Sequence, residues 1–194
     1  MQNSNKKLND YLKKIINNKE LEHHIPSILN EFTILQISKN SYLVENGKVC
    51  AYFCYLEQGV LQHSIDVKGE EKTTYLALEN TSTTALKSFK QNQPSRKNIK
   101  ALCDCNLWVI DFKKFTFLIE NNKGFRRFYH HLIENQIFLI DDYRINLLTL
   151  APEERYEKLI IKHPNLIQQI PLHYLASFLG ISSRHMTRIR KKIN

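Results

Sequence analysis

The chain has 194 residues, 42% of them hydrophobic and 24% charged, so it can bury a sizeable core and is neither disordered nor of low complexity. Its apolar stretches fall far short of the roughly 20 residues of a membrane span, and its lysine-rich N-terminus lacks the apolar centre of a signal peptide. We therefore expect a cytoplasmic protein that binds no membrane. Its four cysteines are expected to be free thiols. Its net charge of +9 makes a polyanion one candidate partner.

Residues 5–35 have the apolar spacing of amphipathic helices. Leu8, Leu12, Ile15 and Ile16 recur at helical intervals, and Pro26 interrupts a second apolar run. The pattern predicts one or two helices ahead of the first strand.

Residues 41–112 change to short segments rich in Val, Ile, Tyr and Phe, with glycines between them. The sequence from Asp66 to Glu70 predicts a hairpin that joins residues 60–65 to residues 72–78. Further strands are expected at residues 99–105 and 107–112, and about six or seven such strands are typical of a small antiparallel barrel or jelly roll. Cys103 and Cys105 would share one face of the strand at 99–105 as core thiols.

A long helix is predicted from about Phe125 to Leu148, with two apolar stripes. The first consists of Phe128, Leu132, Leu139 and Tyr143, and the second of Ile133, Ile137, Ile140 and Leu147. Two apolar faces indicate two partners, the barrel and a second copy of the chain, and we assign the first stripe to a homodimer. The alternative is a single buried core helix. On this helix the adjacent residues His130 and His131 point about 100° apart, so no metal site is expected there.

Positive charge is concentrated at the C-terminal end. Residues 151–194 contain eight Lys and Arg against three Asp and Glu, and residues 183–194 contain five cations and no acid. The positions of Ala176, Gly180, Met186 and Ile189 predict two short helices that cross at a steep angle. Gly180 would end the first helix in the left-handed conformation, and Ser182 would cap the second.

The second of these helices divides cleanly into an apolar and a basic side. Met186, Ile189 and Ile193 would point inward, which leaves the basic side for the major groove of double-stranded DNA. The alternative is a solvated basic helix that contacts no nucleic acid. The expected base readers are Ser183, Arg184, Thr187 and Arg188, the expected phosphate contacts are Arg190, Lys191 and Lys192, and Ser182 lies beside them. No nucleophile–base pattern or nucleotide-binding loop is present, so we expect no catalytic residue and no enzyme.

The order of these elements resembles the Crp/Fnr family of bacterial transcription regulators, and locally its short Bacteroidetes-type members. The likeness rests on Gly47, Gly59 and Gly69-Glu70 in the barrel, and on three C-terminal stretches: Ala151 to Tyr156, Leu175 to Ile181 and Arg188 to Lys192. It implies an α+β fold with a β-roll (double-stranded β-helix) over residues 1–124, a dimerisation helix over 125–148 and a helix-turn-helix DNA-binding domain over 149–194. It also implies a phosphate contact near His173 and RNA polymerase as a further partner.

The chain departs from the family members that bind cyclic AMP. Their phosphate-binding turn contains glycine, whereas no glycine lies between Gly69 and Gly124 here. We therefore expect neither cyclic AMP nor another resident cofactor, although an unknown effector could bind in the corresponding region. The candidate pocket residues there are Glu79, Ser88, Ser95 and Arg96. The alternative function is that of a small-molecule-binding or cupin-like barrel, as sensor or enzyme, whose basic C-terminus does not read DNA. A cupin metal site would need several histidines, and the barrel contains only His63.

Overall fold

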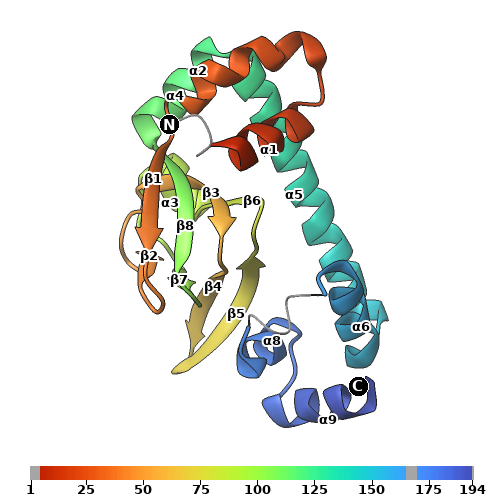
Figure 1. Cartoon of the computed structure of the whole chain (residues 1–194). Helices are drawn as coiled ribbons and strands as arrows, with labels where there is room; N and C mark the ends of the chain where they lie inside the picture. Colours follow the sequence, from red (N-terminus) through yellow and green to blue (C-terminus); the bar gives the residue numbers. More distant parts are fainter. Residues whose placement is uncertain (1–4, 165–169, 194) are drawn as a thin grey trace.

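The computed structural model describes residues 5–164 and 170–193. An antiparallel β-roll lies beside one long helix, and three shorter helices of the described chain gather at the far end of that helix (Figure 1). The fold is α+β, as the sequence predicts.

The N-terminal helices are α1 (Lys6–Ile16), the 3-10 helix η1 (Lys19–His24) and α2 (Ile25–Leu29). Leu8, Leu12 and Ile16 of α1 are buried, as their spacing predicts, and α1 packs against the long helix. The helical prediction is wrong at its end, because residues 33–37 form a strand that pairs with Cys105–Asp111 over five residue pairs.

The described residues form eight strands in two four-stranded antiparallel sheets, β1-β8-β3-β6 and β2-β7-β4-β5. A two-residue turn joins β4 to β5, where Val67 pairs with Glu70. Lys68 and Gly69 both have positive φ, at 56° and 82°, which is the turn that matches strand twist and confirms the predicted hairpin. The strands are β1 (Thr33–Ile37), β2 (Tyr42–Val44), β3 (Tyr52–Gln58), β4 (Leu61–Val67), β5 (Glu70–Ala77), β6 (Thr81–Thr83), β7 (Asn98–Ala101) and β8 (Cys105–Asp111).

The predicted placement of Cys103 and Cys105 in one strand is wrong. Cys103 lies in the bend after β7, and Cys105 begins β8. All four cysteines are free. Burial, with the neighbouring Cys103 as the next cause, raises the pKa of the Cys105 thiol to about 12, so this thiol is protonated at neutral pH.

Helix α3 (Leu86–Gln91) lies in the polar stretch after β6, and α4 (Phe112–Asn121) follows β8 directly. Phe89 of α3 is buried against the rings of Phe112 and Phe115. The remaining helices are α5 (Lys123–Thr149), α6 (Pro152–Lys162), α8 (Leu172–Phe178) and α9 (Ser183–Ile193). None of the helices in the described residues is both long and apolar enough to cross a membrane.

The first apolar stripe of α5, which we assigned to a dimer, is not uniform: its N-terminal part is buried within this chain, whereas Leu139 is 41% exposed. Phe128 is buried against Phe53 and Phe125, and Leu132 is also buried, so both belong to the core of this chain and their assignment to a dimer is wrong. The second stripe faces outward instead, with Ile137 58% and Ile140 65% exposed.

Candidate nucleic-acid interface

The turn between α8 and α9 closes with two backbone hydrogen bonds. The N–H of Ile181 donates to the Ala176 carbonyl at 3.0 Å, and the N–H of Gly180 donates to the Ser177 carbonyl at 3.2 Å. Gly180 has a φ of 72°, the left-handed conformation that such a helix end requires and that glycine adopts without strain. The predicted role of Gly180 is confirmed.

Helix α9 begins at the cap that the sequence predicts. The Ser182 hydroxyl accepts a hydrogen bond from the backbone N–H of His185 at 3.2 Å. One face of α9 is then anchored, because Met186 and Ile189 are buried together with Ala176, Leu179 and Tyr156. The opposite face of α9 is therefore held in a fixed orientation toward solvent.

That solvent face contains the residues that we predicted to meet nucleic acid. Arg190 is half-buried and lines a shallow groove of about 290 Å³ together with Leu172, Thr187 and Lys191. Among the described residues, no ion pair engages an arginine or lysine of α9. The exposed members are Ser182, Ser183, Arg184, Thr187, Arg188, Lys191 and Lys192, and His173 is exposed on α8.

An acidic residue contacts α9 only from the side. His185 Nε2 lies 3.4 Å from Glu153 Oε1 of α6, so this pair joins α9 to α6 and leaves the basic face open. The Thr187 hydroxyl donates to the Ser183 carbonyl at 2.9 Å, which limits it to accepting bonds from a ligand. The structure thus brings the predicted base readers together on one helix face.

Two side chains hold α8 in place, in a role that the sequence analysis assigned to neither of them. The Arg155 guanidinium donates to the carbonyls of Leu150 at 2.9 Å and Leu179 at 3.0 Å, and so joins the start of α6 to the end of α8. The Tyr143 hydroxyl, which we assigned to the dimer, donates to the Phe178 carbonyl at 2.7 Å. Carbonyls at a helix end lack partners within the helix, and these two side chains supply them. Arg155 lies within the family-like stretch from Ala151 to Tyr156, which was the one signal available.

Helix α8 also rests on the outer face of the β-roll. Val60, Leu76 and Leu102 of the roll are buried with Ile170 and Leu175. At the edge of this apolar contact the backbone N–H of Thr73 donates to the Ser177 hydroxyl at 2.8 Å. The roll and the basic helix pair are therefore in direct contact.

Three of the candidate effector residues are engaged in hydrogen bonds within the roll. The Ser88 hydroxyl accepts from the Cys50 N–H at 2.9 Å and donates to the Gln93 carbonyl at 2.6 Å. The Ser95 hydroxyl donates to the Lys97 carbonyl at 2.7 Å, and Glu79 accepts from the Gly59 N–H at 3.2 Å. Arg96 is exposed. No hydrogen bond joins any two of the four within the part of the chain that the structure describes, so their shared pocket stays a prediction.

A buried histidine lies on the core side of the roll. His63 is on the same face of β4 as the core residue Leu61, and its Nε2 is 2.7 Å from the Thr83 hydroxyl. Burial, and then the positive charge of Lys97, lower the pKa of His63 to about 3. Its Nδ1 is buried without a partner in residues 5–164 and 170–193. Sequence reasoning noted His63 only as a lone histidine.

Comparison with known proteins agrees with this architecture. Residues 34–122 match the family described as cyclic nucleotide-binding domain. No curated protein matches the sequence. Solved structures similar to the chain include FixK2 from Bradyrhizobium japonicum, with 10% identity, 84% of each chain covered and a TM-score of 0.71.

Two further neighbours extend the comparison. The c-di-GMP-responsive global regulator CLP from Xanthomonas campestris has 13% identity, a TM-score of 0.67, and coverage of 88% of this chain and 90% of its own. A Crp/Fnr-family transcriptional regulator from Eubacterium rectale has 14% identity, a TM-score of 0.65, and coverage of 90% and 82%. Such identities establish a common fold, and the resemblance to Crp/Fnr regulators is confirmed at that level.

Proposed function

We propose that this chain, with a cyclic nucleotide-binding-type roll and the fold of Crp/Fnr regulators, is a homodimeric, sequence-specific DNA-binding transcription regulator rather than an enzyme. The observation that supports this most directly is the exposed, acid-free cationic face of α9 on a helix whose other face is anchored in a core. In this proposal α8 and α9 are a helix-turn-helix, and RNA polymerase is a further partner by the same family likeness.

The cations of α9 divide by their position along the helix. Arg184 and Arg188 lie in its first two turns, where a helix inserted into the major groove meets base edges and where arginine makes two hydrogen bonds to guanine. Lys191 and Lys192 lie in its last turn and suit phosphates, which strengthen binding without reading sequence. His173 on α8 is the proposed phosphate contact at the start of the motif.

The proposed dimer uses the outward stripe of α5. Ile137, Ile140 and Leu147 of this stripe are 58%, 65% and 43% exposed and follow one another at helical intervals along one face. A second copy packed there would bury this stripe and present two α9 helices related by a two-fold axis. The expected operator is an inverted repeat with half-sites about 34 Å apart.

Any effector would act through the roll. Cyclic AMP is disfavoured, because the stretch between Gly69 and Gly124 has no glycine and the hydroxyls of Ser88 and Ser95 already donate hydrogen bonds to the carbonyls of Gln93 and Lys97. The contact between β5 and α8 gives an effector in the roll a direct route to the basic helix.

The test is selection of binding sites from a pool of random double-stranded DNA at fixed, near-physiological salt. The wild type should select a palindromic motif that the variant Arg184→Ala, Arg188→Ala no longer selects. The control Lys6→Ala, Lys7→Ala removes two exposed cations from α1 and should select the wild-type motif. If the wild-type dimer selects no sequence, or if the double variant selects the same motif, the proposal fails and the roll alone is the functional part.

A further inference from the structure

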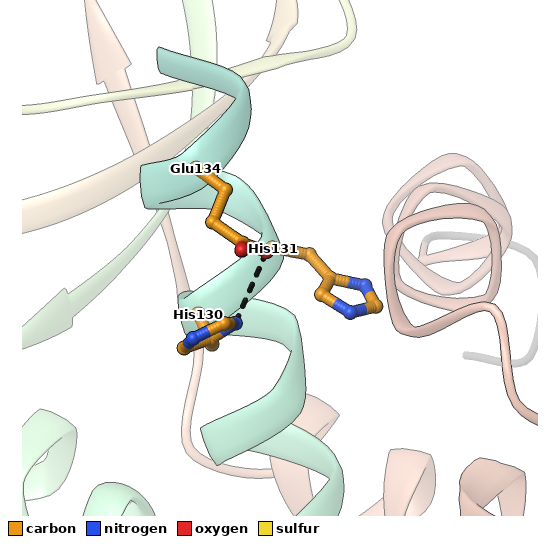
Figure 2. A group of neighbouring side chains, drawn as sticks. All are labelled: His130, His131 and Glu134. Atoms are coloured by element: carbon orange, nitrogen blue, oxygen red, sulfur yellow. Dashed lines mark ion pairs between the residues drawn. The ribbon is translucent and has the colours of Figure 1, made fainter. Parts of the chain in front are cut away.

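Three side chains with metal-binding atoms gather on α5 beside the end of α1. One ligand atom each from His130, His131 and Glu134 lies within 4.8 Å of the others. Figure 2 shows His130 and Glu134 facing one another, whereas the His131 ring, on the same stretch of helix, is directed toward α1. We propose that these three residues bind one divalent transition-metal ion of the Zn²⁺ class.

The glutamate resolves the divergence of the two neighbouring histidines. Glu134 is four residues after His130 and three after His131, so its carboxylate is one turn away from both. The His130 Nδ1 and Glu134 Oε2 atoms are already 3.1 Å apart. Bonds of about 2.0–2.1 Å in a tetrahedral zinc site place neighbouring ligand atoms roughly 3.3 Å apart. This pair is therefore at chelating separation, and a ring nitrogen of His131 lies within 4.8 Å of both atoms, so the His131 side chain must turn toward the pair to complete the site.

The hydrogen bond of His131 fixes the tautomer that a metal requires. Its Nδ1 lies 2.9 Å from the carbonyl oxygen of Ile15, an atom that can only accept. Nδ1 therefore has the proton, and the lone pair of Nε2 is left for a ligand. Metal-binding histidines are commonly oriented by such a bond from their other nitrogen to a backbone carbonyl.

The surroundings decide the class of metal and its access. A groove of about 380 Å³ between α1 and α5 includes His131 and Glu134, together with Asn17, Asn135 and Phe138, so water can complete the coordination of an ion. Two imidazoles with one carboxylate suit Zn²⁺ and its neighbours, whereas Mg²⁺ and Ca²⁺ prefer oxygen ligands. Lys14 lines the same groove, and its positive charge should keep the affinity below that of closed structural zinc sites.

The competing explanation is an ordinary surface pair. His130 and Glu134 are both exposed and would attract one another as an ion pair without any metal. Such a pair gives His131 no role and predicts no stoichiometric metal binding, so metal binding separates the two explanations.

The experiment titrates the metal-free, tag-free full chain with Zn²⁺ in competition with a chromophoric chelator near pH 7. The wild type should bind one Zn²⁺ per chain, and His130→Ala, His131→Ala and Glu134→Gln should each weaken binding by at least about tenfold. The control His23→Ala, His24→Ala removes the other pair of adjacent histidines, which is not part of the cluster, and should bind as the wild type does. Absence of Zn²⁺ binding, or wild-type affinity in Glu134→Gln, would overturn the site.

Cysteine is the remaining competitor for zinc, and Co²⁺ distinguishes it. Co²⁺ bound to nitrogen and oxygen shows only weak visible bands, whereas thiolate ligands add intense near-ultraviolet charge-transfer bands. The proposal requires the first spectrum. The second would place the metal at cysteines such as the half-exposed Cys103 and would contradict the proposal. Glu134→Gln replaces one carboxylate oxygen of an exposed side chain by an amide group, and circular dichroism checks that the fold of this variant is intact.

Discussion

The Tyr143 hydroxyl donates a 2.7 Å hydrogen bond to the Phe178 carbonyl, and the two rings stack with their centroids 5.4 Å apart. This contact joins the long helix α5 to the end of α8, and so connects the proposed dimer helix to the proposed DNA-binding helices. Any rotation of α5 would displace α8 or break this contact.

Removing that hydroxyl tests the contact alone. Tyr143→Phe keeps the ring stacking and loses one half-buried hydrogen bond, so the free energy of unfolding should fall by about 1 kcal/mol. Denaturant titration measures this fall. Tyr129→Phe is the matched control, since the Tyr129 hydroxyl makes no hydrogen bond within the described residues, and it should change stability far less. Equal losses in both variants would show that the Tyr143–Phe178 bond contributes nothing.

The arginines and lysines of α9 should differ in their effect on specificity. Arg184→Ala or Arg188→Ala should cost about 1–3 kcal/mol at the selected site and relax the base preference there. Lys191→Ala should weaken selected and random DNA alike and lower the salt dependence of binding. Fluorescence anisotropy on both DNAs at several salt concentrations measures these effects, and a selective loss in Lys191→Ala would refute its assignment to phosphate.

Charge on the outward stripe of α5 should separate the proposed dimer. Ile137→Glu or Ile140→Glu would bury a carboxylate in the seam and should give monomers in sedimentation. Ile161→Glu on α6 is the control, because Ile161 is 82% exposed and lies outside the stripe, and this variant should stay dimeric. A dimer that survives both α5 substitutions would show that the seam lies elsewhere.

His63 should make the roll sensitive to acid. Its pKa is about 3 in the folded chain, from burial and then Lys97, against about 6.5 when unfolded. Below pH 6.5 the unfolded chain binds a proton at His63 that the folded chain does not. The free energy of unfolding is therefore unaffected by His63 above pH 6.5 and declines as the pH falls toward 3.

The measurement is the free energy of unfolding at several pH values in that window. It should fall by up to about 1.4 kcal/mol per pH unit more steeply in the wild type than in His63→Gln. The exposed His173→Gln is the control and should keep the wild-type slope. Parallel slopes for the wild type and His63→Gln would contradict the assignment.

Local chemistry made several elements predictable from the sequence. The hairpin at Gly69, the helix end at Gly180 and the cap at Ser182 each depend on one residue whose backbone or side chain has few alternatives. Their neighbours in space do not alter that choice, and all three predictions are confirmed.

The failures arise where a choice depends on distant residues. Both stripes of α5 are equally apolar, and only the packing of Phe128 against Phe53 decides which of them faces the roll. The spacing of Ile34, Leu35 and Ile37 suits either period, and pairing with β8 makes residues 33–37 a strand. Arg155 could not be assigned because its carbonyl partners are set by the positions of α5 and α8.

The contact between Thr73 and Ser177 spans 104 residues of sequence, and the apolar cluster beside it draws on both parts of the chain. Ile170 and Leu175 are buried there against Val60, Leu76 and Leu102 of the roll. A fragment of residues 149–194 would thus expose this apolar face of α8, and we expect it not to fold independently. The boundary read from sequence at residue 149 therefore does not coincide with a boundary in the packing, because the roll and the last helices share one apolar cluster.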